Sequence, residues 1–167
     1  MSLIGSDARL SGDSLYRYRL WRVWDESKPR LCFIMLNPST ADAFQDDATI
    51  RVCKGRAIRM GYGGLDVVNL FALRSTNPVE LYTHPAPISH PQEPQRSSDE
   101  LIAAATGAGF VICAWGRHGA YRDRGRNVLL DLKGRGIKTH AIKINGDGSP
   151  AHPLRISYDV QPVGFQI

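Results

Sequence analysis

The sequence has no apolar stretch that approaches the roughly 20 residues that a helix needs to span a bilayer. Its first residues also lack the basic flank and the apolar segment of a secretory signal peptide. These two absences argue against a membrane protein and against secretion. We therefore expect a cytoplasmic location and no membrane partner.

Cysteine is scarce, and histidine is scattered along the chain. The three cysteines are widely spaced and flanked by apolar residues, which is typical of small buried side chains rather than of a disulfide framework. The five histidines show neither an H-E-x-x-H motif nor the spacing of a zinc site. The sequence thus predicts no metal site and no bound cofactor.

Length and composition are those of one globular unit. The chain has 167 residues, of which 43% are hydrophobic and 22% are charged. No internal repeat or low-complexity segment divides it. We expect a single α/β domain over residues 1–167.

The chain is basic, with a net charge of +5, and the excess of positive charge is local. Seven basic residues between positions 117 and 138 are opposed by only two aspartates: Arg117, Arg122, Arg124, Arg126, Lys133, Arg135 and Lys138. Such a patch attracts polyanions through counterion release, which favours a nucleic acid or a nucleotide as the partner. A solvated helix face without a binding role is the alternative explanation.

Short apolar segments alternate with segments of helical periodicity. Buried strands are predicted at 31–36, 65–70, 110–114 and 137–142. The helices between them are predicted to begin at Asp46 or Asp47, at Ser97 or Ser98, and near Gly119. The proline-rich segment 75–95 reads as a long loop, apart from a short helical turn that residues 79–82 could form. Residues 16–24 read as an edge or near-edge strand antiparallel to 31–36. This order predicts a three-layer α/β sandwich with a mainly parallel four-stranded sheet plus the antiparallel N-terminal edge strand.

Polar or aromatic residues follow each predicted parallel strand. Asn37 follows the first, and Pro38 has a fixed φ and no N–H, so the strand ends there. The later strand ends carry Asn69, Trp115 and the segment before His152. Right-handed crossovers bring such ends to one edge of a sheet, where ligands bind. We expect a site at this edge, although Asn-Pro and Ser-Thr are also ordinary turn and cap residues.

Blocks of sequence at these junctions resemble a known family. They are residues 35–42 (MLNPSTAD), 47–51 (DATIR), 61–64 (GYGG), 68–74 (VNLFALR), 114–119 (AWGRHG) and 152–154 (HPL). The blocks resemble those of a bacterial and phage family catalogued as domain of unknown function 1643. The resemblance covers nearly the whole chain, but that family name implies no activity.

The order of the strand-end residues is also similar to that of the uracil-DNA glycosylase superfamily. In those enzymes a Gly-x-Asp-Pro or Gly-x-Asn-Pro block and a later His-Pro or Asn-Pro block flank a flipped base. Asn37 falls on the Asp or Asn of the first block, Asn69 near the base-reading residue, and His152 on the start of the last block. This resemblance implies a uracil-DNA glycosylase-like fold. The serine of the DNA-probing loop is missing after Pro153, so a shared fold with altered chemistry is the alternative.

The glycosylase resemblance implies catalytic roles for a small set of residues. Asn37 would position a water beneath the sugar, and His152 would donate a hydrogen bond to the departing base. An amide is a poor general base, so catalysis needs help from a nearby carboxylate. The candidates are Asp42, Asp46 and Asp47, of which we assign Asp42 and Asp47 to the catalytic set.

The same resemblance implies a set of binding residues. Asn69 offers a donor and an acceptor to a Watson–Crick edge, and Phe71 or Trp115 offers a stacking surface. Further substrate contacts are assigned to Ser39, Thr40, Arg74 and His118, and phosphate contacts to Arg51, Arg117 and Arg122.

Two other functions fit the sequence. A non-catalytic nucleic-acid or nucleotide-binding module would use arginines on phosphates and would need the aspartates only as helix caps. A phosphohydrolase or transferase would use the aspartates with a divalent ion, but no second carboxylate cluster lies near the other strand ends. The position of the aspartates relative to Asn37 therefore discriminates between an enzyme and a binding module.

Overall fold

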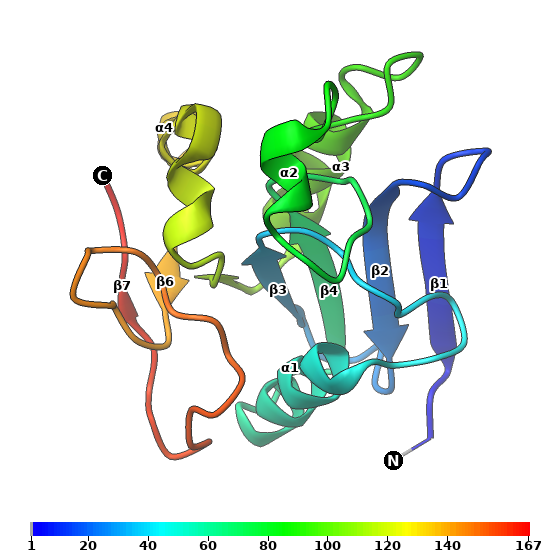
Figure 1. Ribbon diagram of the computed structural model, residues 1–167. Helices are drawn as coiled ribbons and strands as arrows, with labels where there is room; N and C mark the ends of the chain where they lie inside the picture. Colours follow the sequence, from blue (N-terminus) through cyan, green and yellow to red (C-terminus); the bar gives the residue numbers. More distant parts are fainter. Residues whose placement is uncertain (1) are drawn as a thin grey trace.

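A mixed seven-stranded sheet forms the centre of the molecule in the computed structural model, which describes residues 2–167 (Figure 1). The strands are β1 (Gly5–Leu10), β2 (Arg17–Val23), β3 (Arg30–Met35), β4 (Gly64–Asn69), β5 (Phe110–Cys113), β6 (His140–Ala141) and β7 (Val163–Gly164). The helices are α1 (Ala48–Arg59), α2 (Glu80–Thr83), α3 (Arg96–Gly107), the 3-10 helix η1 (Arg117–Asp123) and α4 (Arg124–Gly134). Over residues 2–167, none of the helices combines the length and the apolar character needed to cross a membrane.

The strand order is β1-β2-β4-β3-β5-β6-β7. The inner strands β4, β3, β5 and β6 run parallel, whereas β1, β2 and β7 pair antiparallel with their neighbours. Two predictions are wrong here, because the sheet has seven strands and because β2, the second strand from the edge, pairs with β4 and not with β3. The N–H groups of Trp24 and Asp25 both bind the carbonyl of Gly63, which sets β2 along β4 instead of along β3.

Different helices cover the two faces of the sheet, which gives three layers. Side chains alternate along a strand, so the apolar run of β3 needs cover on both faces. Cys32 and Ile34 pack in one cluster with residues of α3 and α4, whereas Leu31, Phe33 and Met35 pack in another with residues of α1. Figure 1 shows α1 and α3 on opposite sides of the strands.

Helix α1 begins at its predicted cap. The carboxylate of Asp47 accepts a hydrogen bond from the N–H of Ile50 at 2.9 Å, as an N-cap side chain does. The buried Arg56 of this helix donates to the carbonyls of Ser157 (2.9 Å) and Val160 (2.8 Å). These bonds tie the segment that follows His152 to α1.

The chain after Trp115 departs from the predicted helix near Gly119. The segment is first a 3-10 helix, and α4 begins only at Arg124, because Arg122 and Asp123 have positive φ angles of 54° and 53°. A Cβ at Gly119 would lie 2.0 Å from Cδ1 of Trp115, so the close passage over the indole requires glycine.

Three smaller differences concern short elements. The strand predicted at 137–142 is only the two-residue β6, and the helical turn predicted at 79–82 is the one-turn helix α2, displaced by one residue. Strands β1 and β7 lie in segments for which the sequence predicted no strand. A two-residue strand leaves no detectable period in a sequence, which explains why β7 and the true length of β6 were missed.

A bulge in β2 changes the direction of its first side chains. Leu10 pairs with Arg17 while Arg9 pairs with Arg19, so Tyr18 is an extra residue between them. Simple alternation predicted Arg17 and Arg19 on one face. Instead, Arg19 binds Asp66 at 2.8 Å on the α3 side, whereas Arg17 donates to the carbonyl of Ala41 at 2.8 Å on the α1 side.

Candidate functional site

A cavity of about 390 Å³ lies at the carboxyl ends of β3, β4 and β5, beside the N-terminus of α1. The strand ends, the first turn of α1, the segment 75–78 and residues 152 and 154 contribute to its wall. Seven of the residues that the sequence assigned to a site line it: Asn37, Ser39, Asp47, Asn69, Trp115, His118 and His152. The structure thus brings the predicted strand-end residues together.

The other predicted site residues do not line this cavity. Phe71 is fully buried in the core on the α3 side, so it does not stack on a ligand here. Thr40 and Arg74 line a neighbouring groove of about 360 Å³, where Arg74 donates to the carbonyls of Ser39 and Ser14. Arg117 lines a separate groove near Trp115. The side chains of Arg51 and Arg122 are exposed, which leaves the three predicted phosphate contacts outside the cavity.

Asn37 is held by its neighbours in one orientation. Its Nδ2 donates to the carbonyl of Ser75 at 3.0 Å and to the carbonyl of Pro38 at 3.2 Å. Because the amide nitrogen is occupied, the carbonyl oxygen Oδ1 is the group that Asn37 can offer to a ligand or a water.

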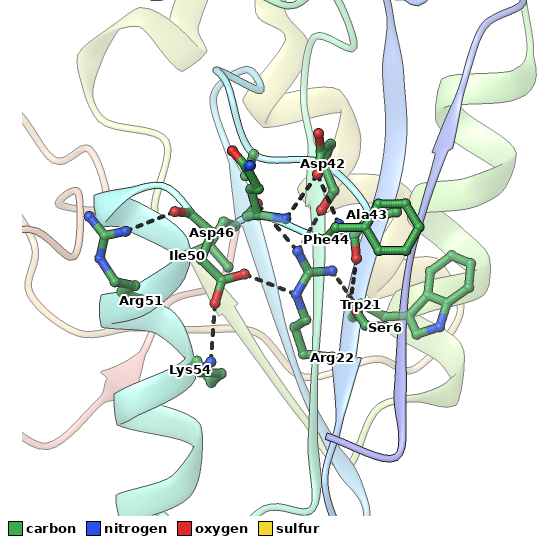
Figure 2. Close-up of polar contacts among 12 residues, drawn as sticks. Ser6, Trp21, Arg22, Asp42, Ala43, Phe44, Asp46, Ile50, Arg51 and Lys54 are labelled. Atoms are coloured by element: carbon green, nitrogen blue, oxygen red, sulfur yellow. Dashed lines mark hydrogen bonds and ion pairs between the residues drawn. The ribbon is translucent and has the colours of Figure 1, made fainter. Parts of the chain in front are cut away.

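The aspartates of the segment 42–47 have different surroundings. Asp42 accepts from the N–H groups of Phe44 and Gln45, which lowers the pKa of its carboxyl, and it closes a local turn. Asp46 pairs with Arg22 at 2.9 Å and with Lys54 at 3.1 Å (Figure 2). Neither lines the cavity, so the assignment of Asp42 to the catalytic set is not supported by its position. Asp47 alone of the three lines the cavity.

The buried Arg22 fixes this segment. It donates to the carbonyls of Asp42 and Gln45 as well as to the carboxylate of Asp46, as Figure 2 shows in part. Because Asp46 directly precedes Asp47, these bonds also fix the position of the cavity carboxylate.

Asn69 is buried without hydrogen-bond partners. Its side chain is 3% exposed, and neither Nδ2 nor Oδ1 has a partner. No other side chain in residues 2–167 has two such atoms. A buried unpaired polar atom costs about 1–3 kcal/mol, so this amide is not explained as a strand cap.

His152 stands at the exposed rim of the cavity. Its Nδ1 accepts from the N–H of Leu154 at 3.2 Å, so the neutral ring carries its proton on Nε2. Partial burial lowers the pKa of His152 below 6.5, and the negative charge of Asp47 opposes that shift. His152 is therefore a neutral Nε2–H donor at pH 7.

Two aromatic groups complete the wall. Trp115 is 6% exposed and packs edge-on against Phe165, with ring centroids 6.0 Å apart. The Nδ1 atom of His118 lies 2.7 Å from the hydroxyl of Tyr82 in α2, which joins the segment 75–95 to η1. Residues 2–167 contain no group of three or more His, Cys, Asp or Glu side chains placed to hold a metal ion.

The family model of DUF1643, a protein family of unknown function, matches residues 17–154. The chain belongs to the DUF1643 family. The first and the last residues of the match, Arg17 and Leu154, are also the first and last residues that line the cavity. No curated protein and no solved structure matches this DUF1643 chain significantly, so its function has to be argued from the site.

Arg17 is a cavity residue of the DUF1643 chain that the sequence interpretation missed. Its side chain is 2% exposed, and its Nε has no partner. The β2 bulge turns it toward α1, and a pattern of strict alternation hides such a shift. The only signal in the sequence was an arginine among the aromatic residues of a buried strand.

Proposed function

We propose that this DUF1643 protein binds a nucleobase in the cavity and hydrolyses the N-glycosidic bond that joins the base to its sugar. The observation that supports this function best is the unpartnered amide of Asn69 in a cavity that also contains Asn37, Asp47 and His152. An amide side chain is complementary to the donor and acceptor pair on the edge of a base.

The size and composition of the cavity fit such a ligand. A volume of about 390 Å³ lies in the range of small-molecule sites, which are mostly apolar with a few placed polar groups. Met35, Ile50 and Trp115 supply an apolar wall against which a base can pack. An extruded base needs both features.

The reaction that fits these side chains is a hydrolysis. The bond between C1′ and the base nitrogen breaks, its electron pair leaves with the base, and the oxygen of a water bonds to C1′. Asn37 Oδ1 holds this water, and Asp47 accepts its proton. His152 Nε2–H stabilises the departing base anion by a hydrogen bond, and the proton taken by Asp47 finally neutralises the base.

The position of Asp47 favours an enzyme over a binding module. A module needs this carboxylate only as a helix cap, whereas a hydrolase needs one within the cavity. Asp47 caps α1 and also lines the cavity. The exposed arginines around residues 117–126 favour the second candidate function, a phosphate-binding module without catalysis, which predicts binding that weakens steeply with salt.

The test is base release from oligonucleotides that carry uracil, mismatched bases or modified bases, and from the free nucleosides, detected by chromatography. Asp47→Asn keeps a residue that can cap α1 but removes the carboxylate that accepts the proton of the water. We expect this variant to lower turnover by at least 100-fold. Asp42→Asn changes a carboxylate outside the cavity and should retain turnover within about twofold. Binding of these ligands without release of any base, even at stoichiometric protein, would identify the binding module instead.

A further inference from the structure

Arg17 is a charged group in the cavity wall that the proposed hydrolysis does not use. Its Nη1 donates to the carbonyl of Ala41 at 2.8 Å, and its Nε has no partner. Burial lowers the pKa of Arg17 to about 10, so the guanidinium is still charged at pH 7. A buried cation with an unpaired donor is unfavourable unless a ligand completes it.

Unpartnered polar atoms concentrate at this cavity. Residues 2–167 contain five buried side-chain nitrogen or oxygen atoms without a partner. Three of them belong to Arg17 and Asn69, which both line the cavity. Arg17 and Asn69 of this wall therefore hold two nitrogen donors and one oxygen acceptor that have no partner within the protein.

The two side chains differ in what they can recognise. The amide of Asn69 is not anchored by any hydrogen bond, so a half-turn of its terminal torsion exchanges donor and acceptor. By itself, Asn69 can therefore bind the edge of an oxo base and the edge of an amino base equally well. A guanidinium only donates, so Arg17 requires an acceptor on the ligand. Arg17 thus removes the ambiguity that Asn69 leaves.

We propose that Arg17 contacts the position at which oxo and amino bases differ, C4 of a pyrimidine or C6 of a purine, and so makes the cavity selective for uracil and hypoxanthine, which carry an oxygen there, over cytosine and adenine, which carry an amino group. The inference rests on the proposed function, because it requires a base in the cavity. An exocyclic amino group at this position would place donor against donor and leave the Arg17 Nε unpaired, whereas a carbonyl oxygen accepts a charge-assisted hydrogen bond.

The same contact serves the proposed reaction. As the base departs, negative charge develops on its ring and spreads to its carbonyl oxygens. Arg17 is a fixed positive charge in the cavity wall, and the carboxylate of Asp47 is the opposite charge that acts most strongly on it. Oxo bases distribute the developing charge onto an oxygen that Arg17 contacts, so selectivity and rate depend on one residue.

The experiment uses bases in which a methyl group replaces the sugar, so that no bond can be hydrolysed. The pairs are 1-methyluracil with 1-methylcytosine and 9-methylhypoxanthine with 9-methyladenine, titrated by NMR. For the wild-type protein we expect each oxo base to bind at least tenfold tighter than its amino partner. Arg17→Met should reduce both ratios to about one, and Arg17→Lys should give intermediate ratios.

A control separates selectivity from loss of packing. Arg56 is also buried with an unpartnered Nε, but it does not line the cavity, so Arg56→Met should leave both ratios unchanged. Equal affinity for the two members of each pair in the wild-type protein overturns the role of Arg17 and leaves the proposed function intact. Ratios that persist in Arg17→Met also overturn that role. Failure of the wild-type protein to bind any of the four bases overturns the proposed function together with the inference.

Discussion

Two arginines of β2, Arg17 and Arg22, lie on the same face of the sheet and are equally buried, with exposed fractions of 2% and 1%. Arg22 donates to one carboxylate and to several backbone carbonyls. The guanidinium of Arg17 makes one hydrogen bond, to the carbonyl of Ala41, and its Nε is unpaired. The two ends of one strand thus hold a saturated and an unsaturated guanidinium.

The difference between the two arginines indicates a structural role for Arg22 and, under the proposed function, a binding role for Arg17. The donors of Arg22 are matched by acceptors of the protein itself, and the result is a fixed path for the chain from residue 42 to Asp47. The donors of Arg17 are only partly matched, and it lines a cavity whose other unsatisfied group is Asn69. Under the proposed function, the protein supplies acceptors for the donors of Arg22 at one end of β2, whereas the unpaired Nε of Arg17 at the other end is left for a ligand.

The largest expected effect on stability follows from substitution of Arg22, the arginine whose donors are matched by acceptors of the protein. Arg22→Met removes the partner of Asp46 and the donor to the carbonyls of Asp42 and Gln45. Removal of one partner from a buried ion pair is strongly destabilising, and we expect a loss of about 3 kcal/mol in the free energy of unfolding. Urea denaturation followed by circular dichroism measures this loss.

Arg51→Met is the matched control for that substitution. Arg51 binds the carbonyl of Asp46 from the exposed side of the same segment, at 2.8 Å. An exposed hydrogen bond contributes little, so the change should stay within about 0.5 kcal/mol. Equal losses in the two variants would show that the Arg22 network does not hold the segment.

A second prediction compares two asparagines at strand ends. Asn69→Leu replaces two unpaired polar atoms by apolar ones and should raise the free energy of unfolding by about 1 kcal/mol, because a desolvation penalty disappears. Asn37→Leu deletes two satisfied hydrogen bonds and should lower it by about 1 kcal/mol. Denaturation of both variants under one set of conditions gives the two signs.

The outcome bears directly on function. Stability gained by Asn69→Leu should accompany loss of base binding, as is usual where a site keeps unfavourable polar groups for its ligand. If both substitutions lower the free energy of unfolding by a similar amount, Asn69 has a hydrogen-bond partner within the protein. The main observation in favour of a ligand in the cavity is then lost.

The site was predictable wherever it depends on strand ends. Asn37 and Trp115 directly follow predicted strands, Asn69 lies near the end of one, and His152 comes after the turn that follows the last. Parallel strands with right-handed crossovers bring such residues to one edge. The sequence also limited the N-cap of α1 to two neighbouring aspartates, because helix capping depends only on residues close in the chain. These features depend only on the nearest elements of the chain.

What the sequence did not reveal depends on distant partners. Asp42, Asp46 and Asp47 look alike in sequence. Only the folded structure shows that Arg22 binds the carboxylate of Asp46 and that the carboxylate of Asp47 belongs to a residue of the cavity wall. The pairing of β2 with β4 joins residues more than 40 positions apart, such as Leu20 with Val67. The bulge at Tyr18 shifts the strand period by one residue, and a single sequence offers no sign of it.

The smallest expected effect concerns the pH dependence of stability at the cavity rim. The pKa of His152 is lowered in the folded protein, below the 6.5 of an unfolded chain, so the unfolded state binds more protons between these two values. Stability therefore rises with pH through this window. The penalty from His152 is fully present below its folded pKa and is absent well above 6.5.

His152→Gln removes this contribution, while the other titrating groups remain in both proteins. We expect the difference in free energy of unfolding between wild type and variant to shift in favour of the variant as the pH falls from 7.5 to 5. A difference that does not change with pH means that folding leaves the pKa of His152 unchanged. A difference that favours the wild type in acid means that Asp47 stabilises a protonated His152. In that case the ring of His152 is a cation that pairs with the carboxylate of Asp47. It is then not the neutral Nε2–H donor that the proposed reaction requires.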